Sequence, residues 1–160
     1  MPIVLAWGKL GSERAGIIVI LFCLPWARGW GGGVFKWQIV YGAPRSRGEL
    51  GLISIETEGY PCNSGNRGSL EQHASAQTLR REMNLTGLEL AQLAAKGDAE
   101  AIAYWEKFGQ RLGMGIANLV YVLTPEAVII GGGLSASSSY FFPPWHRKLR
   151  KGCYYLPVGV

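Results

Sequence analysis

The sequence has few cysteines and no long hydrophobic run, and each shortage excludes a class of protein. Its three cysteines, Cys23, Cys62 and Cys153, are an odd number without close spacing. They therefore indicate neither a disulfide framework nor a Cys-x-x-Cys site, and they fit a cytoplasmic protein in a reducing compartment. The most apolar run, Ala15 to Trp26, is too short at 12 residues to span a bilayer, so we expect no membrane partner.

Acidic residues are outnumbered, and aspartate is scarce. Lysine and arginine number 16 against 11 aspartate and glutamate residues, which gives a formal net charge of +5. A basic balance favours anionic ligands weakly, and nucleic acid is one of them. No nucleic-acid recognition motif accompanies the charge, so we favour a solvated basic surface and expect no nucleic-acid partner.

The composition that remains is that of a globular chain. Apolar residues make up 48% of the 160 residues and charged residues 17%, which predicts one domain, or most of one, with a real core. The run from Ala15 to Trp26 does not alternate, so we expect a strand in the centre of a sheet that is covered on both faces. A signal peptide is the alternative, because Lys9 and Arg14 precede the run, but the abundance of β-branched residues favours the strand.

Turn formers and apolar periodicity predict the other elements. A strand followed by the glycine run at residues 131–133 and then by a helix is an arrangement that brings a ligand to a helix N-terminus. The longest expected helix carries apolar residues at helical spacing on one face, namely Ala101, Ile102, Trp105, Phe108, Leu112, Ile116, Leu119 and Val120. The expected elements are a glycine loop at Arg28 to Gly33, strands at Val34 to Tyr41, Glu49 to Glu58 and Glu126 to Ile130, and helices at Ser69 to Met83, Gly87 to Lys96, Asp98 to Leu123 and from Ser135 or Ser137 toward Lys151.

The stretch from Gly59 to His73, GYPCNSGNRGSLEQH, is dense in turn formers. Such a composition predicts a tight loop whose backbone takes left-handed or otherwise special dihedrals. Ser69 and Gln72 stand at the spacing of a capping box, so the loop should end by starting a helix, with Glu71 in its first turn. We expect His73 to be a partly buried structural histidine and not a base.

Residues Cys62 to Glu71 resemble the signature of the ROK family (repressors, open reading frames and sugar kinases), which reads Cys-x-Cys-Gly-x-x-Gly-Cys-x-Glu. Both glycines, the first cysteine and the glutamate match, whereas Ser64 and Ser69 stand where the family has cysteines. In the family these cysteines and the histidine of a Glu-x-Gly-His motif bind a structural zinc, and that histidine is Leu52 here. Leucine cannot bind a metal and a serine hydroxyl is a poor ligand beside a thiolate, so we expect no zinc and a loop held by backbone and hydroxyl hydrogen bonds.

Two glycine clusters resemble the nucleotide-binding motifs of the same family, although glycine clusters by themselves are usually turns. Ala27 to Gly33 is similar to its Gly-Thr-Gly-x-Gly-Gly-Gly motif, with Arg28 in place of the threonine that helps to hold the phosphates. Leu123 to Ser135 is similar to its Leu-Asn-Pro-Glu-x-Ile-Val-Leu-Gly-Gly-Gly-Val-Ser pattern, whose glycines face the adenosine of ATP. The resemblance implies ATP with Mg²⁺ as cofactor, bound at Gly29, Gly31, Gly32, Gly33, Gly131, Gly132 and Gly133.

Glu49 and Glu71 are, by the same resemblance, the two carboxylates that accept hydrogen bonds from the hydroxyls of a hexose. Ionised carboxylates suit this task because they only accept hydrogen bonds. The plainer interpretation is that Glu49 is a surface charge on an edge strand and that Glu71 complements a helix dipole. The family motif around them favours sugar contact.

The resemblance implies an α/β fold, namely one half of an actin-like, hexokinase-type ATPase with a ribonuclease H-like sheet and helices. It also implies ATP-dependent phosphorylation of a hexose such as glucose, as in glucokinases. The family's catalytic aspartate belongs to an N-terminal half that this chain does not resemble, and no aspartate precedes Asp98 here. We therefore expect residues 1–160 to be a single partial domain, equivalent to the C-terminal domain of such a kinase, with no catalytic residue and little or no activity.

A non-catalytic role is the alternative. ROK proteins often dimerise through this domain, and the six tryptophans could cover such a face, so a sugar-binding module or a homodimerisation module fits the same residues. Transcriptional regulation, the role of the family's repressors, would need an N-terminal helix-turn-helix, and we expect no room for one before Ala15.

Overall fold

A mixed sheet and a set of helices make up the computed structural model, which describes residues 18–23, 30–35, 38–39, 49–123, 127–131, 133–142 and 154–157. The α/β class is therefore confirmed. The sheet has the spatial order β3-β2-β1-β4-β5. Its strands are β1 (Ile18–Cys23), β2 (Trp30–Phe35), β3 (Gln38–Ile39), β4 (Ala127–Gly131) and β5 (Tyr154–Pro157).

Strand β1 lies in the centre of the sheet, as the apolar run that contains it predicts. It pairs antiparallel with β2 and parallel with β4, so that Ile20 has Gly33 as its partner on one side and Val128 on the other. Strand β2 also pairs antiparallel with β3. A parallel pair needs a long crossover connection, and the connection from β1 to β4 carries the long helix of the fold.

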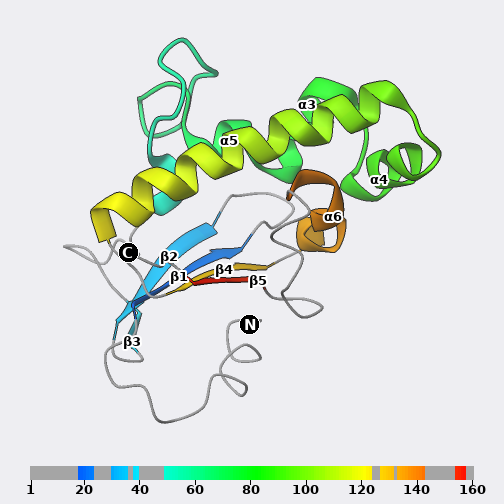
Figure 1. Cartoon of the computed structure of the whole chain (residues 1–160). Coiled ribbons are helices and arrows are strands. Elements are labelled where there is room, and N and C mark those ends of the chain that lie inside the picture. The colour runs from blue at the N-terminus through cyan, green and yellow to red at the C-terminus, as the bar shows by residue number, and fades with distance from the viewer. Residues whose placement is uncertain are drawn as a thin grey trace.

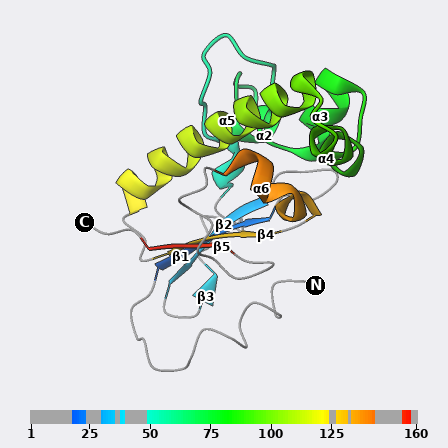
Figure 2. The same ribbon diagram turned by 45° about the vertical axis from the view of Figure 1, so that its right-hand side comes forward.

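The described helices lie on one face of the sheet (Figures 1 and 2). Coverage of the opposite face stays a prediction. No helix within the described ranges is long and apolar enough to cross a membrane. The longest is α5 (Ala99–Leu123), and around it lie the short 3-10 helices η1 (Leu50–Leu52) and η2 (Gly133–Ser137) and the α-helices α2 (Leu70–His73), α3 (Ala76–Met83), α4 (Gly87–Ala95) and α6 (Ser138–Phe141).

Helix α5 begins where the sequence predicts and supplies much of the core. The carboxylate of Asp98 caps it, because its Oδ1 accepts a hydrogen bond from the backbone nitrogen of Ala101 at 2.8 Å. Ile102 is instead 39% exposed, because it lies at the edge of the apolar stripe. The buried residues of the predicted face pack with β4 and α6 in one core, and they are Ala101, Trp105, Phe108, Leu112, Ile116 and Leu119.

The helix predicted for residues 69–83 is wrong in one respect, because the structure divides it into α2 and α3. The break follows His73, and Ser75 caps the second helix by accepting a hydrogen bond from the backbone nitrogen of Thr78 at 3.3 Å. Ser69 precedes α2 but makes no capping bond with its side chain. A serine six residues further along has therefore taken the capping role.

The capping box of this region lies at the start of α4. Thr86 Oγ1 accepts a hydrogen bond from the backbone nitrogen of Glu89 at 3.2 Å, and Glu89 Oε2 accepts one from the backbone nitrogen of Thr86 at 2.7 Å. These hydrogen bonds to Thr86 lower the pKa of the Glu89 carboxyl. The predicted boundaries of this helix, residues 87–96, agree with α4 within one residue.

The first glycine cluster is largely strand, and the loop prediction is wrong for it. Gly31, Gly32 and Gly33 lie within β2 and pair with β1, whereas Gly29 lies outside the described residues. Glycine has a low strand propensity, but the partner strand supplies the hydrogen bonds that hold the ladder. The predicted strand at residues 34–41 is correspondingly displaced, since β2 ends at Phe35.

The strand predicted at residues 49–58 is also wrong. Residues 50–52 form η1, and only Ser54 makes an isolated bridge, with Ser69 as its partner. The helix predicted to run toward Lys151 ends within the described residues at Phe141, because Phe142 is extended and precedes a proline, a position that disfavours helical dihedrals.

Candidate functional site

Residues 53–69, here called the site loop, fold back on themselves in two nested turns. The outer turn joins the backbone nitrogen of Ile55 to the carbonyl oxygen of Gly68 at 2.8 Å. The inner turn joins the backbone nitrogen of Cys62 to the carbonyl oxygen of Asn66 at 2.9 Å. These bonds pair backbone groups of the loop with one another, so residues 53–58 do not join the sheet as the predicted strand would.

A serine hydroxyl completes the site loop. Ser54 Oγ donates a hydrogen bond to the carbonyl oxygen of Arg67 at 2.8 Å and accepts one from Asn66 Nδ2 at 2.9 Å. The expectation that backbone and hydroxyl hydrogen bonds hold this loop is confirmed.

Two glycines are required where the site loop meets α2. Gly68 has a φ of +65°, and a Cβ atom on it would overlap the carbonyl oxygen of Glu56. A Cβ atom on Gly59 would overlap Nε2 of His73. Gly68 therefore lets the site loop close on itself, and Gly59 lets the loop pack against His73 of α2.

The positions that resemble zinc ligands do not fit a zinc ion. Leu52 has no donor atom, Ser64 is exposed, and Ser69 is fully buried with a hydroxyl that lacks a partner among the described residues. Cys62 alone carries a thiol. One thiol and two hydroxyls are not a donor set that Zn²⁺ binds stably, so the chemistry of these side chains does not fit the family's metal.

Glu71 lies in α2 with its carboxylate partly exposed. Cys62 Sγ lies 3.5 Å from Glu71 Oε1, and the described residues supply no other hydrogen bond to this carboxylate. Its backbone is fixed from the neighbouring residue, because the nitrogen of Leu70 donates to the carbonyl oxygen of Ile53 at 2.9 Å. Leu70 is itself buried against α5, where a Cβ atom on Gly115 would crowd it.

Glu49 directly precedes η1 and is exposed. Helix η1 packs against both α2 and β2, so the structure brings together the two elements that carry Glu49 and Glu71. The two carboxylates thus come from neighbouring elements and both reach solvent. Their contact with a sugar stays a prediction.

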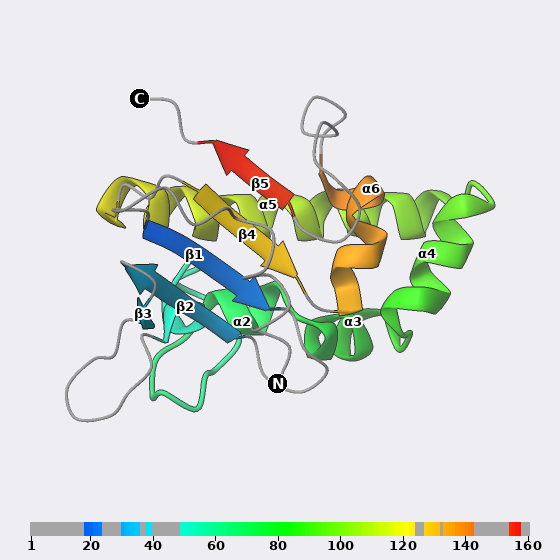
Figure 3. The same ribbon diagram turned by 90° about the horizontal axis from the view of Figure 1, so that it is seen from below.

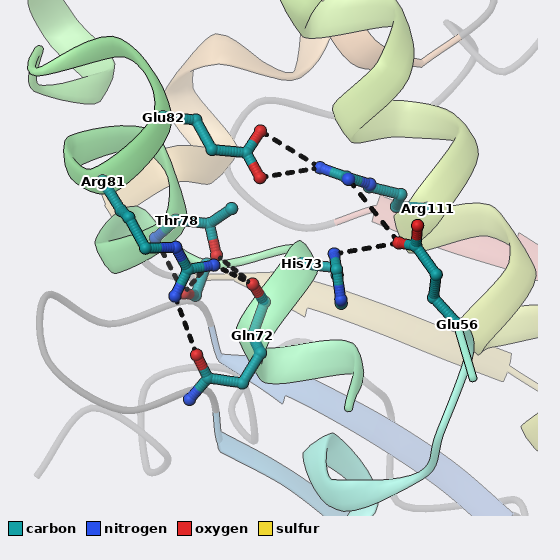
Figure 4. A network of polar contacts seen from close by, with 8 residues as sticks. Glu56, Gln72, His73, Thr78, Arg81, Glu82 and Arg111 are labelled. Carbon is teal, nitrogen blue, oxygen red and sulfur yellow. Dashed lines mark hydrogen bonds and ion pairs between the residues drawn. The ribbon is translucent and has the colours of Figure 1, made fainter. Parts of the chain in front are cut away.

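A charged network (Glu56, His73, Glu82 and Arg111) surrounds the end of α2 (Figure 4). His73 Nδ1 lies 3.2 Å from Glu56 Oε2, and a guanidinium nitrogen of Arg111 lies 3.6 Å from the same oxygen. Arg111 also donates to both carboxylate oxygens of Glu82, at 3.1 and 3.2 Å. The network therefore ties the site loop, α2, α3 and α5 to one another.

His73 is more deeply buried than the sequence predicts, at 1% exposure. Burial is the main cause that lowers the pKa of its imidazole, and the nearby guanidinium of Arg111 lowers it further, while Glu56 and Glu82 oppose the shift. Neither ring nitrogen has a hydrogen-bond partner among the described residues, so the approach of Nδ1 to Glu56 Oε2 is a close electrostatic contact and not a hydrogen bond.

Gln72, the expected partner in a capping box, binds an arginine instead. Arg81 donates to Gln72 Oε1 at 2.9 Å, and Thr78 Oγ1 donates to the carbonyl oxygen of Gln72 at 2.9 Å. The guanidinium of Arg81 also lies 3.6 Å from the centre of the Tyr60 ring, which is a cation–π contact. These contacts join α3 to the end of α2 and to the site loop.

The register of the sheet brings the two glycine clusters to the same end of the strands (Figure 3). Strands β1 and β4 run parallel and both end there, and β2 begins there. Phe22 of β1 is paired with Gly31, and Cys23 of β1 is paired with Gly131. Gly31 and Gly131 therefore lie on opposite sides of the end of β1, and ligands of open α/β sheets bind outside the carboxyl ends of such strands.

An open pocket of about 380 Å³ lies beside the second glycine cluster. Its volume is in the range of small-molecule sites. A Cβ atom on Gly133 would meet nothing within 4 Å, whereas one on Gly87 would overlap the side chain of Leu134, so η2 packs closely on the start of α4. Gly132 lies outside the described residues. The pocket is lined by Ala76, Arg80, Thr86, Gly87, Leu88, Gly133, Leu134, Ala136 and Ser137.

The model of a protein family described as "ROK family" matches residues 5–153. The chain belongs to the ROK family. Over 86% of its length this ROK chain aligns with a glucokinase from Halalkalibacterium halodurans, at 32% identity, and the alignment covers 47% of that protein. The chain thus spans about half the length of the curated relatives that it matches.

Solved ROK structures have the same fold. The ROK hexokinase from Thermus thermophilus superposes on 86% of this chain with a TM-score of 0.72 at 26% identity, and 49% of that protein is covered. A ROK family glucokinase from Streptomyces griseus, crystallised with glucose and AMPPNP, superposes on 92% of this chain with a TM-score of 0.70 at 23% identity, and 56% of it is covered. The resemblance to glucokinase-type ROK sugar kinases, read from the motifs, is confirmed by these matches.

Two groups of residues in this site were missed by the sequence analysis. The charged network joins residues up to 55 positions apart, from Glu56 to Arg111, and no local pattern indicates such a contact. The pocket residues of α3 and α4, such as Arg80 and Thr86, likewise meet η2 only through the packing of helices. Sequence signals mark turns and caps, which involve neighbouring residues. These contacts join residues that are far apart in the sequence, so no such signal indicates them.

Proposed function

We propose that this chain is the part of a glucokinase-type ROK kinase that binds both substrates, a hexose such as glucose and ATP with Mg²⁺. The observation that carries the proposal is the position of Gly31 and Gly131 on either side of the end of β1, with Gly133 of the pocket at η2 two residues after Gly131. Residues 1–160 would then be a single partial domain, equivalent to the C-terminal domain of such kinases, in the cytoplasm.

The finer fold assignment is part of this proposal. We infer that the sheet is the ribonuclease H-like sheet of an actin-like, hexokinase-type ATPase. Three antiparallel strands, β1 to β3, continued by the parallel strand β4, support it, as do the helices on one face. The fold likeness to the Thermus hexokinase supports it as well.

The sugar would meet the two carboxylates. Glu49 and Glu71 both reach solvent from packed neighbouring elements, and each can accept hydrogen bonds from sugar hydroxyls. A pair of hydrogen-bonded hydroxyls orients a hexose in a way that apolar contact alone would not.

ATP would bind with its adenosine in the pocket at η2 and its phosphates near the end of β1. The pocket offers apolar walls from Leu88 and Leu134 and one cationic side chain, Arg80, which are suited to a flat base. Glycine at positions 31 and 131 has no side chain that would keep a phosphate away from the backbone. Mg²⁺ would bind together with the phosphates of ATP, which supply ligands to the ion in such sites.

Transfer also needs a general base, and this chain offers no aspartate for it. Asp98, the sole aspartate of the sequence, caps α5, where its Oδ1 accepts a hydrogen bond from the backbone nitrogen of Ala101. Phosphoryl transfer depends on positioning, so the chain would supply binding, and we expect residues 1–160 by themselves to phosphorylate glucose negligibly.

A homodimer is the second proposal for this chain. Trp105 is buried, so it does not contribute to a surface, but Tyr121 and Val122 near the end of α5 are 83% and 78% exposed. Aromatic side chains such as tyrosine are enriched in protein–protein interfaces. Sedimentation of a dimer that dissociates in Tyr121→Ser would support it, and a monomer at all concentrations would contradict it.

Thermal unfolding with ligands tests the main proposal. Glucose and AMPPNP, added separately at about 100 times their dissociation constants, should each stabilise the chain by about 2.7 kcal/mol. Glu71→Gln should remove the effect of glucose only, and Ala136→Trp, which fills the pocket, should remove the effect of AMPPNP only. Glu58→Gln, an exposed residue of the site loop, is the matched control and should respond as wild type.

Unfolding that is cooperative but indifferent to both ligands would contradict the proposed function. The absence of zinc is proposed with it, on the donor set of the site loop. Metal analysis of the purified chain should find less than stoichiometric zinc, and one tightly bound zinc per chain would contradict that part.

A further inference from the structure

We propose that the Cys62 thiol positions the Glu71 carboxylate for sugar binding by donating its hydrogen to Glu71 Oε1. This inference rests on the proposed function, because it concerns the same sugar site. At the position where the ROK signature has a metal-binding thiolate, this chain would have a neutral hydrogen-bond donor.

The contact between the two side chains carries the proposal. Cys62 Sγ lies 3.5 Å from Glu71 Oε1, and Cys62 is 8% exposed, so water competes weakly for the thiol. The residues are nine positions apart and meet because the site loop folds back over the start of α2. The contact is a product of the loop's shape and not of sequence proximity.

A second acceptor competes for the same hydrogen. Asn63 Oδ1 lies 3.4 Å from Cys62 Sγ, and a thiol has one hydrogen to donate. A hydrogen bond to an ionised carboxylate is about twice as strong as one to a neutral amide. The thiol hydrogen should therefore go to Glu71 Oε1 and not to Asn63 Oδ1, although the two distances are nearly equal.

Both partners are held in place by backbone hydrogen bonds. The nitrogen of Cys62 donates to the carbonyl oxygen of Asn66 at 2.9 Å. At the other end, the nitrogen of Leu70 donates to the carbonyl oxygen of Ile53 at 2.9 Å, one residue before Glu71. A donor on a fixed backbone can restrain a carboxylate on another fixed backbone, because neither side has to be ordered anew when sugar binds.

The donor role and metal binding exclude each other at Cys62. A metal binds the thiolate, which has no hydrogen to donate and would repel a carboxylate at this distance. Ser64 and Ser69 stand where the signature has the other thiols, so the site loop does not gather ligands that would deprotonate Cys62. The loss of the zinc ligands and the new contact to Glu71 are then two aspects of one change.

The geometry leaves the rest of Glu71 free for a ligand. Cys62 is the one hydrogen-bond donor that the described residues offer to this carboxylate. A single bond to Oε1 restrains the rotation of the side chain while Oε2 remains free to accept from a sugar hydroxyl. Without the thiol, the carboxylate has to be ordered on binding, and glucose affinity should fall about threefold to tenfold.

Calorimetric titration with glucose tests the positioning role. Cys62→Val keeps a similar volume without a donor and should show the threefold to tenfold loss, whereas Cys62→Ser keeps a donor and should retain most of the wild-type affinity. Asn63→Ala removes the competing acceptor and should bind as tightly as wild type. Equal affinity in wild type and Cys62→Val would overturn the proposal and leave the proposed function intact.

Raman spectroscopy of the S–H stretching band tests the contact without any sugar. The band of Cys62 is obtained by difference from Cys62→Ser, which removes the contributions of Cys23 and Cys153. It should lie at the lowered frequency of a hydrogen-bonded thiol and should rise in Glu71→Ala, where Cys62 is untouched. A band that does not move in Glu71→Ala would overturn the proposal even if Cys62→Val failed to fold.

The two proposals fail in different ways. Wild type that unfolds cooperatively but does not bind glucose overturns the proposed function, and the positioning role with it. Wild type that binds glucose while Cys62 carries a stoichiometric zinc overturns the positioning role alone.

Discussion

Helix α5 makes two kinds of contact on neighbouring turns: apolar aromatic packing at Trp105 and Phe108, and charged contacts at Arg111, three residues after Phe108. Trp105 and Phe108 meet Phe141 of α6, with ring centroids 5.5 and 5.2 Å apart. Arg111 instead meets Glu56 and Glu82 in the charged network. Both sides hold neighbouring elements against the same helix, but one does so with apolar area and the other with directed charges.

The stability of the chain should respond differently to substitutions on the two sides. Apolar contacts are individually weak, undirected and roughly additive, so the aromatic side depends on volume. A charged network depends on every partner, because removal of one leaves the others partly buried without compensation. The aromatic side should therefore contribute more to stability, and the charged side should set how stability depends on pH.

Phe108→Ala should have the largest effect. Phe108 is 1% exposed, and truncation of a buried phenylalanine costs about 3–5 kcal/mol through lost contacts and the cavity left behind. Urea unfolding measures the change. Met114→Ala, 49% exposed on the same helix, is the control and should cost less than about 1 kcal/mol. Similar losses in both variants would contradict the assignment of the core to this side.

A pair of glycines in α5 sharpens the comparison. A Cβ atom on Gly109 would overlap the carbonyl oxygen of Phe141, whereas one on Gly113 would meet nothing within 4 Å. Gly109→Ala should therefore destabilise the chain by about 1–3 kcal/mol, as overpacking does. Gly113→Ala should stabilise it by about 1 kcal/mol, because alanine has the higher helix propensity. The same sign for both in thermal unfolding would show that α6 does not press against α5 at Gly109.

Arg111→Met should have a smaller effect on the charged side. The side chain of Glu82 is 13% exposed, and without the guanidinium it keeps a charge that water reaches poorly. We expect a loss of about 1–3 kcal/mol in urea unfolding. Lys107→Met, an exposed position on the same helix, serves as the control and should change stability by less than about 0.5 kcal/mol. An Arg111→Met chain as stable as wild type would mean that the network contributes nothing net.

The smallest predicted effect is the pH dependence. His73 has a lowered pKa in the folded chain, so below the ordinary histidine pKa of about 6.5 the unfolded chain binds a proton that the folded one resists. The free energy of unfolding should therefore decrease as the pH falls below about 6.5, and this contribution should level off below the lowered pKa.

Two variants assign that slope. His73→Phe should remove this part of the pH dependence, since the ring no longer titrates. His146→Gln, at the other histidine of the sequence, should keep it. Urea unfolding at a series of pH values between about 5 and 8 measures both, and a slope that persists in His73→Phe would assign the titration to other groups.

Local signals in the sequence predicted the elements that have recognisable capping residues or apolar periodicity of their own. Asp98 before α5, the apolar run that contains β1 and the helix start near Thr86 were all found, because caps and periodicity are properties of adjacent residues. The break between α2 and α3 was missed, since the apolar periodicity runs on from Leu70 to Met83 and Ser75, which caps α3, was not recognised as a second helix start.

The sequence by itself determined the family and the class of fold, because both depend on residue types at short, fixed spacing. Tertiary structure alone decided which distant residues meet. It placed Gly31 and Gly131 beside one strand end, turned Cys62 toward Glu71 and gathered the charged network around His73. Such contacts arise from the register of a sheet and the packing of helices. Their energies are summed over the whole core, so no local sequence pattern indicates them.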